Sequence, residues 1–214
     1  MRLPSPLYVI LDRDAARGRP LPELLDAVLA GGGRLFQLRD KTQSMAELLP
    51  LARVLRARCR AAGALFFVND RADLALAVEA DGLHVGQDDL PAAAARRILP
   101  PSMRLGVSTH DPDQARRALA DGADYVAVGS MFPTVSKPGF QLVGPALVRR
   151  VRPDIPVPLV AIGGITEANV GEVMGAGADA VAVISAVCGA PDPQAATTRF
   201  LKAIAASAPA GRER

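Results

Sequence analysis

The chain has 214 residues and a mass of 22.3 kDa, enough for one sizeable hydrophobic core and short for two ordinary domains. Half of the residues are apolar and 22% are charged, which excludes an intrinsically disordered protein and a coiled coil. The net charge is only +3 and aromatic residues make up 4%, so we expect no nucleic-acid partner. A small anionic substrate is the partner that such a charge favours.

The sequence also indicates the cellular compartment of the protein. No apolar run approaches the roughly 20 residues that cross a bilayer, and Pro4 and Pro6 interrupt the continuous apolar stretch of a signal peptide. Cys59 and Cys188 are far apart and lack metal-ligand spacing, which favours reduced thiols. We therefore expect a cytoplasmic protein with no membrane partner.

Short apolar runs alternate with amphipathic segments along the chain. The predicted strands cover residues 7–11, 35–38, 65–68, 82–85, 104–107, 125–128, 159–162 and 180–184. The runs are continuously apolar, which is typical of parallel strands buried on both faces. Eight strand–helix units in this length predict an α/β fold, a compact (β/α)8 TIM barrel. We expect a single barrel domain over residues 1–206 and a disordered tail over 207–214.

The main alternative is an open doubly wound sheet. Its dinucleotide-binding form needs Gly-x-Gly-x-x-Gly directly after the first strand, whereas residues 11–14 are Leu-Asp-Arg-Asp. The Pro- and Gly-rich connection over residues 129–143 follows the sixth strand, and a long loop at that face of a barrel is often a lid.

Several helix starts are visible in the sequence. Ser44 and Glu47 predict a capping box, and Pro50 should kink the helix that follows or mark a later start. Asp111 before a proline predicts an N-cap. Thr166 is predicted to cap the helix after the seventh strand.

Two carboxylates lie where a barrel carries its active site, at the carboxyl ends of the strands. Asp70 and Asp89 follow the third and fourth predicted strands, which are neighbours in a barrel, so they could share a hard cation such as Mg2+. The alternative for each residue is that it caps the next helix. Asp88 could replace Asp89, although its register predicts an outward direction.

Cationic side chains occur at the same face. Arg39 and Lys41 end the second strand and Lys137 lies in the loop after the sixth. Arg presents a planar fork to phosphate oxygens and Lys presents a point charge, which suits a diphosphate. The alternative is a surface ion-pair cluster with Asp40.

A second anion site is predicted at the other side of this face. Gly163 and Gly164 follow the seventh strand, and Ile184 and Ser185 follow the eighth. Backbone N–H groups at these positions commonly bind a monophosphate in barrels; the alternative is a Gly-Gly turn that is needed only sterically. The chain has no obvious general base, so the charged set favours a dissociative displacement of diphosphate.

Six blocks of sequence carry a resemblance to a known family. They are QLRDK (37–41), VNDR (68–71), HVGQDD (84–89), GVSTH (106–110), FPTVSK (132–137) and IGGI (162–165). In this order and spacing the chain strongly resembles thiamine-phosphate synthase. The resemblance implies a transferase that joins 4-amino-2-methyl-5-(diphosphooxymethyl)pyrimidine to thiazole phosphate, or to its carboxylated form, and releases diphosphate, with Mg2+ as cofactor.

The resemblance also implies roles for individual residues. It implies that Asp70 and Asp89 bind Mg2+ and that Gln37 contacts the pyrimidine. The diphosphate would be bound by Arg39, Lys41, Asn69, Ser108 and Lys137, of which Arg39, Lys41, Ser108 and Lys137 would act in catalysis. The thiazole phosphate would be bound by Thr134, Ser136, Gly164, Ile184 and Ser185. The predicted substrate-binding set is completed by Leu38, Asp40 and Val135.

Two other functions fit the same fold. A related thiazole tautomerase has a His directly after the glycine that ends the sixth strand, and here Ser130 follows Gly129, so the proton-transfer residue is absent. A barrel that binds phosphorylated thiazoles or pyrimidines without turnover is disfavoured, since an idle set of Arg39, Lys41 and Asp70 would only destabilise the protein. The sequence leaves a homo-oligomer open.

Overall fold

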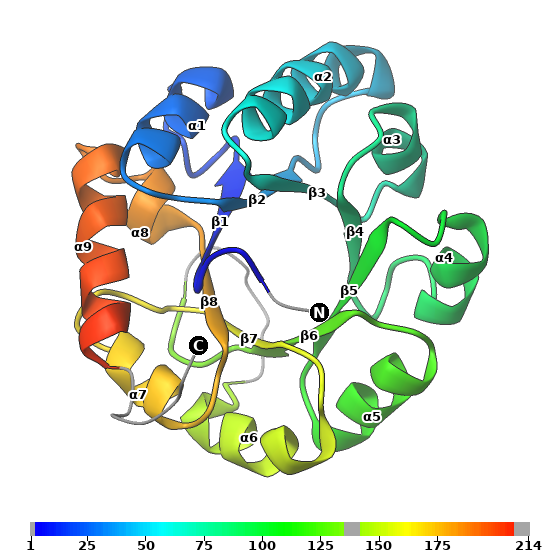
Figure 1. The fold of residues 1–214 in the computed structure, drawn as a ribbon, viewed down its shortest axis with the longest axis vertical. Helices are drawn as coiled ribbons and strands as arrows, with labels where there is room; N and C mark the ends of the chain where they lie inside the picture. Colours follow the sequence, from blue (N-terminus) through cyan, green and yellow to red (C-terminus); the bar gives the residue numbers. More distant parts are fainter. Residues whose placement is uncertain (1–2, 135–141, 208–214) are drawn as a thin grey trace.

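Eight parallel strands form a closed barrel in the computed structural model, which describes residues 3–134 and 142–207. Each strand pairs with the next along the chain, and β8 pairs with β1 (Figure 1). The strands are β1 (Leu7–Asp12), β2 (Leu35–Arg39), β3 (Leu65–Asn69), β4 (Gly82–Val85), β5 (Arg104–Thr109), β6 (Tyr125–Gly129), β7 (Leu159–Ile162) and β8 (Ala180–Val183). The predicted (β/α)8 barrel is confirmed.

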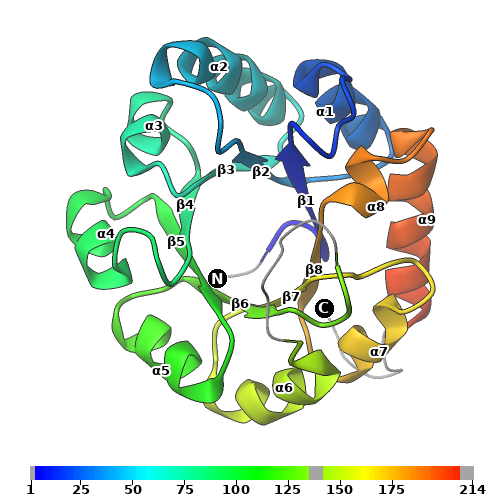
Figure 2. The ribbon, with the colours of Figure 1, turned by 180° about the vertical axis from the view of Figure 1, so that it is seen from behind.

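Helices surround the barrel, as the views from its two ends show (Figures 1 and 2). They are α1 (Leu21–Ala30), α2 (Met45–Ala61), α3 (Ala72–Ala77), α4 (Ala92–Ile98), α5 (Pro112–Ala120), α6 (Gly144–Val151), the 3-10 helix η1 (Arg152–Asp154), α7 (Val170–Gly175), α8 (Ser185–Cys188) and α9 (Pro193–Ala206). Helix α9 packs against both α1 and α7 and so closes the outer ring. Within the described ranges, no helix has the length and apolar character needed to cross a membrane.

Side chains of the strands alternate between two cores. On β1, Leu7, Val9 and Leu11 pack against the helices, whereas Tyr8 and Ile10 join a second cluster whose buried members all come from strands. Successive side chains of a strand point to opposite faces, so this second cluster fills the interior of the barrel. Burial on both faces explains why the strand runs are continuously apolar.

The predicted helix starts at residues 44 and 111 are confirmed. The Glu47 N–H donates to Ser44 Oγ at 3.4 Å, and the Glu47 carboxylate accepts from the Ser44 N–H at 3.0 Å. Helix α2 begins directly after Ser44, so Pro50 lies inside it and the later start is wrong. Asp111 caps α5 by accepting from the Gln114 N–H at 2.8 Å.

The predicted cap at Thr166 is wrong. Helix α7 begins at Val170, and Asn169 is its N-cap residue. The Asn169 side chain accepts from the Thr166 N–H at 2.8 Å. The Thr166 carbonyl accepts from the Val170 N–H at 3.0 Å, so residues 166–169 form a turn ahead of the helix. The helix therefore starts one turn later than predicted.

Candidate active site

Asp70 and Asp89 meet at the carboxyl ends of β3 and β4. Their carboxyl groups lie close enough to share a hydrogen bond when one of them is protonated, and Asp89 accepts from the Gly86 N–H at 2.9 Å. The residues at the N-cap positions of α3 and α4 are Arg71 and Pro91. The alternative that either aspartate caps the next helix is therefore wrong. Their role as metal ligands stays a prediction at this point.

The close approach of the two carboxyl groups changes their acidity. Burial, followed by the hydrogen bond and charge of Asp89, raises the pKa of Asp70 to about 6, against the opposing effect of Lys41. Lys41 Nζ lies 3.4 Å from Asp70 Oδ2. Two ionised carboxylates this close repel each other, and a divalent cation between them would remove that repulsion.

The donor set fits Mg2+. Among residues 3–134 and 142–207, no three or more His, Cys, Asp and Glu side chains are grouped as a metal site, and Asp70 and Asp89 meet as a pair of carboxylates. Mg2+ is commonly held by one or two carboxylates and completes its shell with water and substrate phosphate oxygens. Asp88 is exposed, whereas Asp89 is half-buried, in agreement with the predicted register.

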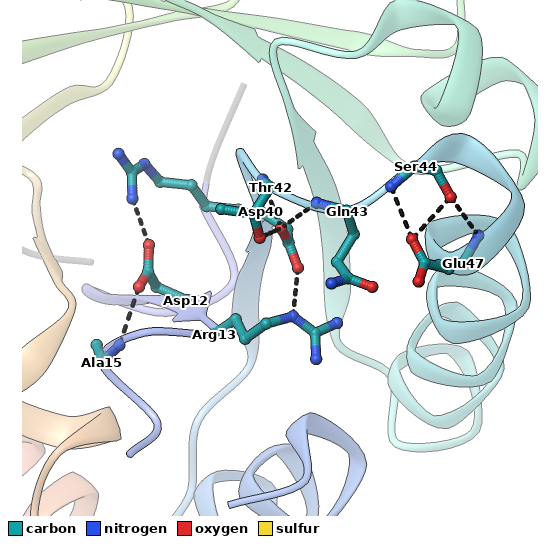
Figure 3. Close-up of polar contacts among 9 residues, drawn as sticks. Asp12, Arg13, Ala15, Asp40, Thr42, Gln43, Ser44 and Glu47 are labelled. Atoms are coloured by element: carbon teal, nitrogen blue, oxygen red, sulfur yellow. Dashed lines mark hydrogen bonds and ion pairs between the residues drawn. The ribbon is translucent and has the colours of Figure 1, made fainter. Parts of the chain in front are cut away.

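Arg39 is held in place by a partner on the neighbouring strand. Its guanidinium forms a short ion pair with Asp12, at the end of β1. Asp12 is 6% exposed and also accepts from the Ala15 N–H at 3.0 Å (Figure 3). Arg can donate five hydrogen bonds, so this pairing fixes the direction of the Arg39 fork and leaves other N–H groups for an anion.

Asp40 stabilises the turn that leads into α2. It accepts from Arg13 Nε at 2.6 Å and from the N–H groups of Thr42 and Gln43 at 2.9 and 3.1 Å (Figure 3). Although burial opposes it, these hydrogen bonds lower the pKa of Asp40 below its usual value. The alternative ion-pair cluster with Asp40 is wrong for Arg39 and Lys41, because Asp40 pairs with Arg13 while those two pair with Asp12 and Asp70; Lys137 lies outside the described residues. A direct contact of Asp40 with substrate stays a prediction.

Other predicted substrate contacts lie around the same end of the barrel. Asn69 and Ser108, at the ends of β3 and β5, are half-buried. Gln37 is buried on β2. Leu38 is 2% exposed and belongs to the core between barrel and helices, so only its backbone can reach a ligand.

The loops after β6 and β7 pack against each other. The Phe132 N–H donates to the Gly163 carbonyl at 2.9 Å. Gly164 has φ +63° and lies so close to the Pro133 carbonyl that a Cβ would overlap it. Both the left-handed backbone and the close approach require glycine here. The steric reason for the glycine is therefore real, and a phosphate site at this turn stays a prediction.

The remaining predicted contacts are only partly described. Thr134 is half-buried, Ile184 packs against the interior cluster, and Ser185 is exposed as the first residue of α8. Val135, Ser136 and Lys137 lie outside the described residues, as do the central residues 135–141 of the predicted lid.

A row of hydrogen bonds that we did not predict crosses the barrel interior. Gln37 Nε2 donates to Tyr8 Oη at 3.0 Å, and Tyr8 Oη lies 3.1 Å from Tyr125 Oη. Tyr125 Oη lies 2.7 Å from His84 Nδ1, and His84 Nε2 lies 2.8 Å from Ser108 Oγ. The available signal was the placement of polar side chains at interior positions of otherwise apolar strands. These five residues are called the interior network below.

A family model described as thiamine monophosphate synthase matches residues 7–187, from β1 into α8. The chain belongs to the thiamine monophosphate synthase family.

Individual relatives in this family cover nearly the whole chain. The thiamine-phosphate synthase of Moorella thermoacetica is 49% identical over 199 residues, covering 92% of this chain and 95% of the relative. That of Methanoculleus marisnigri is 48% identical over 210 residues, covering 96% and 98%. The solved thiamine phosphate pyrophosphorylase of Pyrococcus furiosus has a TM-score of 0.86 and 38% identity, covering 94% of this chain and 96% of that one. The predicted family is confirmed.

Proposed function

We propose that this chain is a thiamine-phosphate synthase, which joins the pyrimidine diphosphate to thiazole phosphate and releases diphosphate. Family membership supports this reaction. The observation that carries the proposal is the meeting of Asp70 and Asp89 beside Lys41 at the carboxyl ends of adjoining strands. Acids and a cation so placed suit the binding of a metal-bound diphosphate.

Asp70 and Asp89 would hold Mg2+, which when bound would neutralise charge on the leaving diphosphate. The raised pKa of Asp70 supports this assignment, because the pair is poised to exchange a proton for a cation.

Arg39 and Lys41 would bind the oxygens of the diphosphate. Asp12 orients the Arg39 guanidinium before substrate arrives, which reduces the conformational entropy lost on binding. Lys41 is exposed and can turn from Asp70 to a phosphate oxygen. Lys137 and Asn69 would add further donors.

The proposed reaction needs charge stabilisation more than proton transfer. The bond between the pyrimidine methylene carbon and the diphosphate oxygen breaks, and both electrons leave with the oxygen. The thiazole nitrogen lone pair then forms the new bond to the methylene cation. No proton moves in either step, so positioned cations carry the rate.

The thiazole phosphate would lie at the turn after β7 and the start of α8. Gly164, Ile184 and Ser185 would present backbone N–H groups, and Thr134 a hydroxyl. This places the two anionic groups on different sides of the same barrel end.

Cysteine chemistry supports a reducing, cytoplasmic location. Cys59 and Cys188 are both free and buried, and burial raises the pKa of each thiol to about 12. Such thiols are unreactive.

We infer that the partners are small phosphorylated molecules.

The test is turnover with purified protein, both substrates and Mg2+. We expect thiamine phosphate and diphosphate in equal amounts, loss of both with chelator and recovery with excess Mg2+. Binding of both substrates with no product would contradict the proposal. So would isomerisation of the carboxylated thiazole phosphate in chelator without the pyrimidine, which is what a tautomerase would do. Ser130 disfavours the tautomerase, because its hydroxyl donates to the Phe132 carbonyl at 3.0 Å.

A further inference from the structure

The interior network joins two predicted substrate contacts through three buried residues that have no predicted contact with substrate. Gln37 on β2 and Ser108 on β5 form its ends. Between them, Tyr8 and Tyr125 are 2% and 0% exposed, and His84 is 7% exposed. Buried polar groups without partners are costly, so the direction of every hydrogen bond in this row is constrained.

The Gln37 amide presents Nε2 to Tyr8 Oη, and with this orientation counting hydrogens fixes the direction of the other bonds. Burial raises the pKa of both phenols above their usual value, so each keeps its single hydrogen. Tyr8 Oη accepts from Gln37 and donates to Tyr125 Oη; Tyr125 then donates to His84 Nδ1. His84 carries its hydrogen on Nε2 and donates it to Ser108 Oγ. Each of the four hydrogen bonds in the row then has one donor hydrogen and one acceptor, and both phenol hydrogens are used.

With Gln37 Nε2 bound to Tyr8, the other states of His84 break the row. If Nδ1 carries a hydrogen, in the second tautomer or in the imidazolium, Tyr125 Oη must accept it. Tyr8 and Tyr125 then have two hydroxyl hydrogens and only one hydrogen bond between them. Within the described residues neither phenol has a further hydrogen-bond partner, so one buried hydrogen would be left without an acceptor.

Packing holds the rings in this geometry. A Cβ on Gly106 would overlap the Tyr125 ring, and one on Gly82 would overlap Phe67, so two glycines provide the space that the aromatic rings occupy. Tyr8 and Tyr125 meet edge to face with centroids 6.0 Å apart, and His84 stacks on Tyr125 at 5.6 Å. Such contacts fix ring orientation.

We propose that Tyr8, Tyr125 and His84 are positioning residues that set the hydrogen-bond polarity of the two ends of the network. Because Gln37 Nε2 donates to Tyr8, the side-chain oxygen of Gln37 is left to accept from the amino group of the pyrimidine. With Ser108 Oγ accepting from His84, its hydroxyl hydrogen is left to donate to the substrate. The substrate part of this inference rests on the proposed function.

The tautomer of His84 tests the network without any substrate. The sequence has only two histidines, so protein labelled with 15N-histidine gives two imidazole patterns in long-range 1H–15N spectra, and a His110→Asn variant assigns the remaining one to His84. We expect the hydrogen on Nε2 at neutral pH. In Tyr125→Phe, the Nδ1 resonance should move toward that of an unbonded nitrogen. A hydrogen on Nδ1 in the wild-type protein would overturn the proposal.

Kinetics test the effect on substrate. Tyr125→Phe keeps the ring and removes both hydrogen bonds of the Tyr125 hydroxyl, so we expect the KM for the pyrimidine diphosphate to rise about tenfold with the KM for thiazole phosphate unchanged. Phe67→Leu is the matched control, because Phe67 packs on both tyrosine rings without joining the row. An equal rise in Phe67→Leu would show that packing, not polarity, sets the KM. Absence of turnover in the wild type would contradict the proposed function, whereas a wrong tautomer with normal turnover would contradict only the network.

Discussion

Asp70 has two unfavourable features, a strained backbone conformation and a carboxyl group that is difficult to ionise. Its φ of +61° lies in the left-handed region, which non-glycine residues seldom adopt although Asp and Asn are the best tolerated. Its pKa is raised by burial and by Asp89. Strain and a perturbed carboxyl group at one residue are typical of functional sites, and neither property is visible in the sequence.

The raised pKa of Asp70 gives a stability prediction with a definite sign. The folded protein binds this proton more tightly than the unfolded chain, so the stabilisation present below about pH 4 is lost as the pH rises through about 6. Asp70→Asn removes the repulsion and retains a residue suited to positive φ. Without Mg2+ at pH 7.5, we expect its melting temperature to rise by roughly 2–4 °C, with the difference vanishing near pH 4, while turnover falls by roughly 10²-fold or more.

Asp88→Asn is the matched control for this experiment. Asp88 is an exposed neighbour of the pair, and its neutralisation should change neither turnover nor melting temperature by a measurable amount. If Asp70→Asn melted lower than the wild type at pH 7.5 and kept its activity, the carboxyl pair would be structural.

Asp12 gives a second prediction at this scale. It binds the Arg39 guanidinium and accepts from the Ala15 N–H; Asp12→Asn keeps the backbone bond and weakens the ion pair. We expect the KM for the pyrimidine diphosphate to rise by about fivefold to tenfold, because an Arg39 side chain that is mobile before binding loses more conformational entropy when it binds the substrate. Steady-state kinetics with each substrate varied in turn would measure it. A higher KM for thiazole phosphate alone would contradict this role of Arg39.

Among the elements, a helix start with a complete capping pattern in the sequence could be predicted, and a start inferred from a single capping residue could not. The capping box at Ser44 and Glu47 is complete within four residues of sequence, and it forms. Thr166 has the same chemistry as a cap, but residues 166–169 form a turn and α7 begins at Val170. Whether such a turn continues as helix depends on backbone geometry that sequence does not show.

The Ser44 cap should affect stability and not catalysis. Replacing such a cap by Ala costs about 1 kcal/mol, which lowers the melting temperature of a domain of this size by roughly 2–4 °C. We expect Ser44→Ala to show this loss in thermal unfolding and to retain wild-type kcat and KM values. A change in turnover without a change in melting temperature would contradict the assignment.

The turn after β7 should respond strongly to a single methyl group. Gly164→Ala places a Cβ against the Pro133 carbonyl in a left-handed backbone, so we expect the loops after β6 and β7 to separate. The KM for thiazole phosphate should rise more than tenfold, an effect above about 1.4 kcal/mol. Gly175→Ala is the control, since a Cβ there meets no atom within 4 Å; an equal effect in both variants would rule out a local cause.

For the whole molecule, counting strand–helix units was enough to predict the barrel and the end at which polar residues collect. The interior network was not predictable in this way. Gln37 and Ser108 come from β2 and β5, and three other strands supply the residues between them. Only closure of the sheet brings these side chains into one row, so their meeting depends on tertiary geometry and not on local pattern.

The central claim is that Asp70 and Asp89 make diphosphate binding depend on Mg2+. Calorimetric titration of diphosphate into the protein, with Mg2+ and then with chelator, tests it most directly, with Asp89→Asn as the third sample. The account predicts binding at least tenfold tighter with Mg2+, about 1.4 kcal/mol or more, and no such gain in Asp89→Asn. Equal affinity in all three titrations would contradict it.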